Sequence, residues 1–233
     1  MKKITLLLSF IACVLVAQAQ LLVNENFSYT VGTELKANGW VGTGATPSTV
    51  NPILITAPSI TYTGYAESGV GNEISLTTSG EDLNKSFTAI TAGTIYFSAI
   101  VNLSAAQATG DYFLHVGDLP TGTSYYGRLF VKLDGTKIAF GMLNTSGGVA
   151  SYTASTYDLN TTYLLVVKFN LSTLAASLIV NPIISTTEPT DGWLTNTTGT
   201  VVVPAGGFQT INIRQGTAAN APTLKLDGIR VAT

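Results

Sequence analysis

The stretch "GRLFVKLDGTKIAFGML", residues 127–143, carries the clearest structural signal in the chain. Its first half forms two alternating rows: Leu129, Val131 and Leu133 in one, and Arg128, Lys132 and Asp134 in the other. An apolar row alternating with a largely charged one predicts a β-strand with one buried face. Asp134-Gly135 then separates this run from a second apolar run, which is a typical turn between two antiparallel strands. The stretch therefore predicts a β-hairpin.

Runs of the same kind recur along the chain, for example "GTIYFSAIVNL" at 93–103 and "YLLVVKFN" at 163–170. The second is apolar on both faces except for Lys168, as in a central strand. About a dozen such runs are separated by turn residues, and we find no capped segment with a helical apolar period. The composition does not change along the chain. We therefore expect an all-β protein with one domain, residues 20–233, built as a two-sheet antiparallel β-sandwich.

The composition favours an extracellular protein. Hydrophobic residues make up 45% of the chain and charged residues only 10%, so Thr, Ser, Asn and Gly must supply much of the surface. The formal net charge is −2, without basic or acidic blocks. This pattern gives no reason to expect nucleic acid or an anionic membrane surface as a partner.

The first nineteen residues predict a signal peptide. Lys2 and Lys3 precede an apolar run, and Ala17-Gln18-Ala19 is a typical cleavage site, so the mature chain would begin at Gln20. The run is short for a membrane helix, and no later segment approaches ~20 apolar residues. We expect a secreted or cell-surface protein without a membrane span.

Cys13 offers an alternative, because "FIAC" loosely resembles the lipid-attachment motif of lipoproteins. Cys13 lies inside the apolar run, however, which favours the signal peptide. Removal of residues 1–19 leaves 9 basic and 13 acidic residues, a net charge of −4, and no cysteine. Disulfides and cysteine-based zinc sites are then excluded from the mature chain.

Several motifs resemble those of secreted proteins from Bacteroidetes-type bacteria that carry a concanavalin A-like, laminin-G-like jelly roll. These motifs are "NENFSYTVGTELKANGW" at 24–40, "YYGRLFVKL" at 125–133, "TTYLLVVKFN" at 161–170 and "IRQGTAANAPTLKLDGIRVAT" at 213–233. The resemblance covers the mature chain and implies a two-sheet jelly roll. Members of that group often continue into further modules or a sorting domain. The shared motifs are structural and imply no single activity.

The only histidine lies in "GDYFLHVGD", residues 110–118. On a regular strand, Asp111 and His115 would share a face about 13 Å apart, which is too far for contact or for joint metal binding. Tyr112, Leu114 and Val116 would form the opposite, apolar row. We find no E-x-D-x-x-E-type spacing, serine nucleophile motif, H-E-x-x-H or phosphate loop. We therefore do not expect an enzyme.

Glu25 and Asp227 are the candidate metal ligands. Glu25 would lie on the inward face of strand 21–29, and a bulge at Asp227-Gly228 would restore the apolar parity of strand 223–232. Because chain ends often lie close together, the two carboxylates could meet and bind a structural Ca²⁺. The alternatives are an ion pair of Glu25 with Arg230 or Lys225, or a Glu25 that reaches water.

Trp193 in "EPTDGWLTN" is the first candidate for ligand binding, followed by Tyr125 and Tyr126. Exposed aromatic rings cover the apolar faces of sugars, whereas Trp40 is expected in the core. The alternative for Trp193 is a loop lid packed on the sandwich edge.

We therefore expect a secreted, non-catalytic module that binds glycans or mediates surface adhesion. The alternative is a structural spacer or a protein-interaction domain of a larger cell-surface protein. The third reading is a glycoside-active enzyme with an atypical site.

Overall fold

The computed structural model describes residues 19–121 and 124–233. Within them the chain forms fifteen β-strands and one short 3₁₀ helix, η1 (Leu35–Asn38). The strands are β1 (Leu21–Glu25), β2 (Val41–Gly42), β3 (Leu54–Thr56), β4 (Glu73–Leu76), β5 (Leu83–Ile90), β6 (Thr94–Ala105), β7 (Asp111–Gly117), β8 (Tyr126–Asp134), β9 (Lys137–Leu143), β10 (Ser151–Tyr152), β11 (Thr162–Asn170), β12 (Ala175–Val180), β13 (Leu194–Asn196), β14 (Phe208–Ile213) and β15 (Thr223–Ala232). Cys13 and the predicted signal peptide, except for Ala19, lie outside the described residues.

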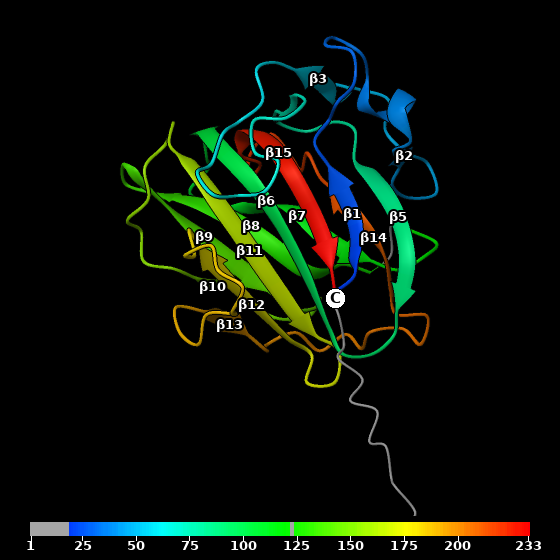
Figure 1. Cartoon of the computed structure of the whole chain (residues 1–233), viewed down its shortest axis with the longest axis vertical. Helices are drawn as coiled ribbons and strands as arrows, with labels where there is room; N and C mark the ends of the chain where they lie inside the picture. The colour runs from blue at the N-terminus through cyan, green and yellow to red at the C-terminus, as the bar shows by residue number, and fades with distance from the viewer. Residues whose placement is uncertain (1–18, 122–123) are drawn as a thin grey trace, which may run out of the picture.

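The strands form two antiparallel sheets that pack face to face (Figure 1). The eight-stranded sheet has the order β13-β12-β11-β6-β15-β4-β3, and β1 also pairs with β15. The seven-stranded sheet has the order β10-β9-β8-β7-β14-β5-β2. Strands distant in sequence, such as β6 and β15, are neighbours, as in jelly rolls. The prediction of an all-β, two-sheet antiparallel sandwich is confirmed.

The hairpin predicted at 127–143 is β8 and β9, which stay in register from Asp134–Lys137 to Arg128–Leu143. Gly135 in the turn has a φ of +64°, a conformation that glycine adopts without a steric penalty. One row of each strand lies in the core between the sheets, with Leu129 and Val131 from β8. The other row of β8 therefore faces outward.

The core between the sheets is rich in large side chains. The largest fully buried aromatic residues are Trp40, Tyr126, Phe27, Phe97, Phe113, Phe140, Phe169 and Phe208. Burial of each such ring stabilises the fold by about 2 kcal/mol relative to exposure. The expectation that Trp40 belongs to the core is confirmed, because the residue is 1% exposed.

The two ends of the described chain lie side by side (Figure 1). β1 runs antiparallel to β15, with Glu25 opposite Ile229. Beyond the strands, the Thr233 amide donates to the Gln20 carbonyl, and the Gln20 amide donates to the Thr233 hydroxyl. The predicted neighbourhood of the terminal strands is thus confirmed, although β1 ends at Glu25 and Phe27 adopts a φ of +48°.

The outer face of the eight-stranded sheet carries a further layer of chain. The segment between β3 and β4, residues 57–72, crosses this face beside β15 and β6, and we call it the strap (Figure 1). Ile60 from the strap, Ile100 and Leu164 form a small second hydrophobic cluster beneath it. Among the described residues, none of the helical structure is long and apolar enough to cross a membrane.

Candidate functional site

Asp227 fastens the beginning of the strap to β15. Its carboxylate accepts hydrogen bonds from the Ser59 hydroxyl at 2.6 Å and from the Ile60 amide at 2.9 Å. The predicted bulge is present, because the pairing of β15 with β6 shifts register between Asp227 and Arg230. Gly228 in the bulge has a φ of +59° and packs against the ring of Tyr65. The bulge therefore turns Asp227 toward the strap.

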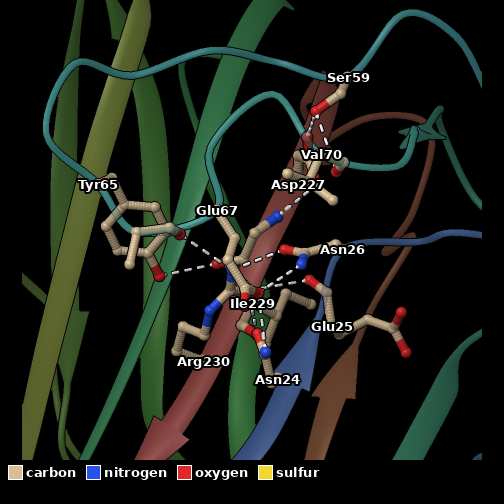
Figure 2. A network of polar contacts seen from close by, with 12 residues as sticks. Asn24, Glu25, Asn26, Ser59, Tyr65, Glu67, Val70, Asp227, Ile229 and Arg230 are labelled. Atoms are coloured by element: carbon tan, nitrogen blue, oxygen red, sulfur yellow. Dashed lines mark hydrogen bonds and ion pairs between the residues drawn. The ribbon is translucent and has the colours of Figure 1, made fainter.

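Arg230 fastens the middle of the strap (Figure 2). Its guanidinium donates to the carbonyls of Glu25 and Ala66 at 3.2 Å and to the Asn26 side chain at 2.6 Å. Glu67 accepts from the side chains of Asn24 and Asn26, both at 2.8 Å, and lies 3.5 Å from Arg230. This network holds the strap against β1 and β15.

Tyr65 completes the attachment. Its hydroxyl donates to the Gly228 carbonyl at 2.8 Å and shares a hydrogen bond with the Ser98 hydroxyl. Burial raises the pKa of Tyr65 to about 12. Tyr65 is partly exposed and lines an open cavity that the strap borders.

The cavity has a volume of about 600 Å³ and lies on the outer face of the eight-stranded sheet. Its floor is formed by β11, β12 and the start of β6, one wall by the strap, and the other wall by the loop that joins β12 to β13. We call it the Trp193 groove; its lining includes Tyr65, Tyr96, Leu164, Val166, Glu188 and Trp193. Ile183 on the rim is 87% exposed, so the groove has an apolar edge.

Trp193 lies at the end of the β12–β13 loop, where its indole N–H donates to the Pro189 carbonyl at 2.9 Å. The Lys168 ammonium lies 4.1 Å from the centre of the indole ring and forms an ion pair with Glu188. The Tyr96 hydroxyl donates to the other oxygen of Glu188 at 2.5 Å. These contacts fix the loop and the indole ring against β6 and β11.

A second, more polar cavity of about 340 Å³ adjoins the Trp193 groove, and the two share Tyr96 and Glu188. Hydrogen bonds from Lys168 and Tyr96 hold the pKa of Glu188 below its usual range. Burial and the Glu188 carboxylate raise the pKa of Tyr96 to about 12. At neutral pH the site therefore presents an ionised Glu188, a protonated Tyr96 and an apolar wall.

The three predicted ligand-binding residues do not form one site. Trp193 lines the groove, whereas Tyr125 directly precedes β8 of the other sheet, with its ring centre 4.8 Å from that of His115. Tyr126 is 1% exposed and packs on Phe208, so its prediction as an exposed aromatic is wrong. The reason is a bulge at Gly127, where a φ of +55° and a register shift turn Tyr126 inward.

The structure also separates the two predicted metal ligands. Glu25 is 3% exposed and faces the core, where its carboxylate accepts from the Trp40 indole, from the Tyr29 hydroxyl and, at 2.6 Å, from Lys85. Asp227 points to the opposite side of the sheet, and Figure 2 shows the Glu25 side chain directed away from the strap network. The predicted joint site is therefore wrong. Within the described part of the chain, no cluster of three or more His, Cys, Asp or Glu residues could hold a metal ion.

Neither ion pair considered for Glu25 is formed. Arg230 reaches only its main-chain carbonyl, and Lys225 pairs with Glu73 at 2.5 Å. The actual partner, Lys85, lies on β5 of the opposite sheet. Contacts between sheets do not follow from strand pairing, which is why the sequence did not reveal this one.

Some residues of the groove were not singled out from the sequence, namely Tyr65, Tyr96 and Glu188. Lys168 was the available signal, because a lone lysine in the apolar run "YLLVVKFN" requires a partner outside its own strand. That partner is Glu188, twenty residues later in the β12–β13 loop.

No protein-family model and no curated protein matches the chain. Among solved structures it is similar to the CBM2 module of the evolved Dit protein of Lactobacillus casei BL23 phage J-1, with a TM-score of 0.50, 11% identity, and coverage of 92% of this chain and 95% of that chain. It is also similar to a sialidase, with a TM-score of 0.52, 11% identity, and coverage of 91% of this chain but only 18% of that chain. At such low identity these similarities establish the fold, a two-sheet β-sandwich.

Proposed function

We propose that the chain is an exported, non-catalytic module that binds a neutral glycan in the Trp193 groove. The observation that carries the proposal is an aromatic and apolar groove joined to a polar cavity through Tyr96 and Glu188. Rings such as Trp193 pack on the apolar faces of a sugar, while hydroxyl and carboxylate groups bond its hydroxyls. Glu188 pairs with Lys168, and Arg230, which also lines the groove, lies 3.5 Å from Glu67. Each of these charges thus has a partner of opposite sign, which suits an uncharged ligand.

The absence of catalysis belongs to the same proposal. Glycoside hydrolysis generally requires two carboxyl groups about 5–9.5 Å apart across the sugar bond. In the described part of the chain, Glu188 is the one carboxylate that lines either cavity, and Lys168 and Tyr96 already bind it. The fold shared with a carbohydrate-binding module supports binding, although both similar structures are distant in sequence.

A glycan array of neutral oligosaccharides, followed by calorimetry on any ligand found, tests the proposal. We expect Trp193→Ala to weaken binding about tenfold or more, and Trp193→Phe to retain most of it, because a flat ring remains. Val149→Ala is the matched control, since Val149 is 77% exposed and does not line the groove. If the folded protein bound nothing on the array, a structural spacer would replace this proposal. Hydrolysis of an array sugar would instead indicate an enzyme.

A further inference from the structure

The outer face of the seven-stranded sheet carries a second group of aromatic and charged side chains. Leu129 and Val131 of β8 lie in the core, so Arg128, Phe130 and Lys132 of the same strand face outward. All three are partly exposed. This row of cation, ring and cation spans about 13 Å along the strand.

Neighbouring strands extend this row into a surface. The Arg128 guanidinium lies 5.1 Å from the ring centre of Tyr112 on β7 and 5.8 Å from that of Phe130. Arg214, which follows β14, lies 4.2 Å from the same Tyr112 ring. Lys132 lies 4.6 Å from the ring centre of Tyr152 on β10. We call these six residues the cation–aromatic face: Tyr112, Arg128, Phe130, Lys132, Tyr152 and Arg214.

A bulge places Tyr112 on this face. The pairing of β7 with β8 skips Phe113, so Tyr112 lies opposite Phe130, while Leu114 lies opposite Leu129 in the core. The prediction that Tyr112 shares an apolar row with Leu114 is therefore wrong. Without the bulge, Tyr112 would point into the core and the two arginines would lose the ring on which they stack.

The charges of this face are only partly balanced. Arg214 forms an ion pair with Asp111 at 2.7 Å and is further stabilised by Asp82. Among the described residues, neither Arg128 nor Lys132 has a carboxylate within ion-pair distance. In the same part of the chain, the Arg128 Nε is buried without an acceptor. Burial and the nearby Arg214 lower the pKa of Arg128, as expected for a cation short of negative charge.

We propose that the cation–aromatic face binds an acidic polysaccharide, one whose sugar rings carry carboxylates. A guanidinium donates to a carboxylate with two parallel N–H groups, and Arg128 has donors to spare. Phe130 lies between Arg128 and Lys132, so one sugar ring can stack on it while its neighbours meet the two cations. An isolated small anion would use only one end of this row.

His115 and Tyr125 act as positioning residues. The His115 ring is 2% exposed and packs edge-on against Tyr125 and Tyr112, with ring centres 4.8 and 5.6 Å away. Burial lowers the pKa of His115 to about 3, so the ring is neutral and adds no charge to the face. The contact with His115 holds the Tyr112 ring in place. Arg128 and Lys132, the two cations without a carboxylate partner, are then the groups that bind the anion.

The test is calorimetry at low ionic strength with three probes: polygalacturonate, its methyl-esterified form, and a single-stranded oligodeoxynucleotide. We expect wild-type protein to bind polygalacturonate and to lose affinity with added NaCl, because exposed charges are screened by salt. The esterified polymer has the same backbone without the charges. Its affinity should be lower than that of polygalacturonate by a factor of about ten or more.

Arg128→Gln with Lys132→Gln should weaken polygalacturonate binding about tenfold or more. Lys132→Gln alone should lower the affinity for polygalacturonate several-fold. Because Lys132 is partly exposed, this single variant replaces the double variant if the double variant does not fold. Lys137→Gln is the control cation, because Lys137 lies on β9 and pairs with Asp158. Trp193→Ala should leave this binding unchanged, which separates it from binding in the Trp193 groove.

Four results would overturn the proposal: no binding of polygalacturonate by the folded wild type, equal affinity for the esterified polymer, unchanged affinity in the Lys132→Gln variant, or tighter binding of the oligodeoxynucleotide. The esterified polymer is itself an uncharged glycan, so its affinity is compared with that of polygalacturonate in the Trp193→Ala variant. With this control, none of the four results bears on neutral sugars in the Trp193 groove, and the two proposals fail separately.

Discussion

The two outer faces of the sandwich are completed in different ways. On the eight-stranded sheet, the strap covers the surface, and its attachment buries charged groups such as Asp227, which is 2% exposed. On the seven-stranded sheet, Arg128 and Lys132 stack on aromatic rings and stay partly exposed. A charge whose hydrogen bonds go to the chain has a structural role, whereas a partly exposed charge without a carboxylate partner stays available to a ligand. The comparison therefore assigns different roles to similar residue types.

The largest expected difference is between the two arginines. Arg230→Met removes the donors to the Ala66 carbonyl, the Asn26 side chain and the Glu67 carboxylate, so it should lower the free energy of unfolding by about 2–3 kcal/mol. Arg128→Met loses a long hydrogen bond, 3.5 Å to the Thr145 carbonyl, and the contacts of the guanidinium with Tyr112 and Phe130, and should cost about 1 kcal/mol. Urea denaturation of both variants measures this difference. Equal losses would mean that Arg128 is as structural as Arg230.

A smaller effect is the pH dependence of stability that His115, on the seven-stranded sheet, produces. His115 has a pKa of about 3 in the folded protein and 6.5 in the unfolded chain, so only the unfolded state gains a proton as the pH falls through this range. The resulting stability is complete above pH 6.5 and is lost on acidification. Between pH 7 and pH 5 the contribution is about 2 kcal/mol. Denaturation curves of wild type and His115→Gln should diverge accordingly, with the smaller pH dependence in the variant. Parallel curves would show that the ring is hydrated.

The smallest effect has the opposite sign and belongs to the strap. Desolvation raises the pKa of Asp227 to about 6 in the folded protein, from 3.8 in the unfolded chain. The folded state therefore gains a proton first, and this contribution increases stability from pH 7 to pH 5 by about 1 kcal/mol. The contribution of Asp227 is the pH dependence of the free energy of unfolding of the wild type minus that of Asp227→Asn. The buried Asp82 titrates in both proteins, so its contribution cancels. A contribution that fell on acidification would contradict the assignment.

The alternation of residue types was sufficient to predict the fold. The hairpin at Asp134-Gly135 and the bulge at Asp227-Gly228 follow from local parity and turn chemistry. The pairing of the terminal strands follows from the general closeness of chain ends. Alternation along a strand predicted the wrong side-chain direction where a bulge has no sequence signal of its own. Phe113 and Gly127 each shift the register and thereby reverse the expected directions of Tyr112 and Tyr126.

The candidate sites were only partly predictable, because they depend on segments that meet across layers. Trp193 was identified from its turn-rich context, and it does line the groove. The opposite wall comes from the strap, whose position is set by Asp227 and Arg230 more than 150 residues later in the chain. The Glu25–Lys85 pair likewise joins two sheets. Such contacts follow from tertiary structure and not from local pattern.

The side-by-side ends of the described chain determine how the domain would respond to mechanical load. Gln20 and Thr233 hydrogen-bond to each other, and β1 has β15 as its sheet neighbour. A force applied through both ends would pull across this strand pair, so its hydrogen bonds would open one after another, as in a zipper. Strands loaded along their length must instead break many bonds together. If the domain were tethered at both ends, β1 would therefore peel away first at low force, and Glu25 would be drawn out of the core before the rest of the sandwich was disturbed.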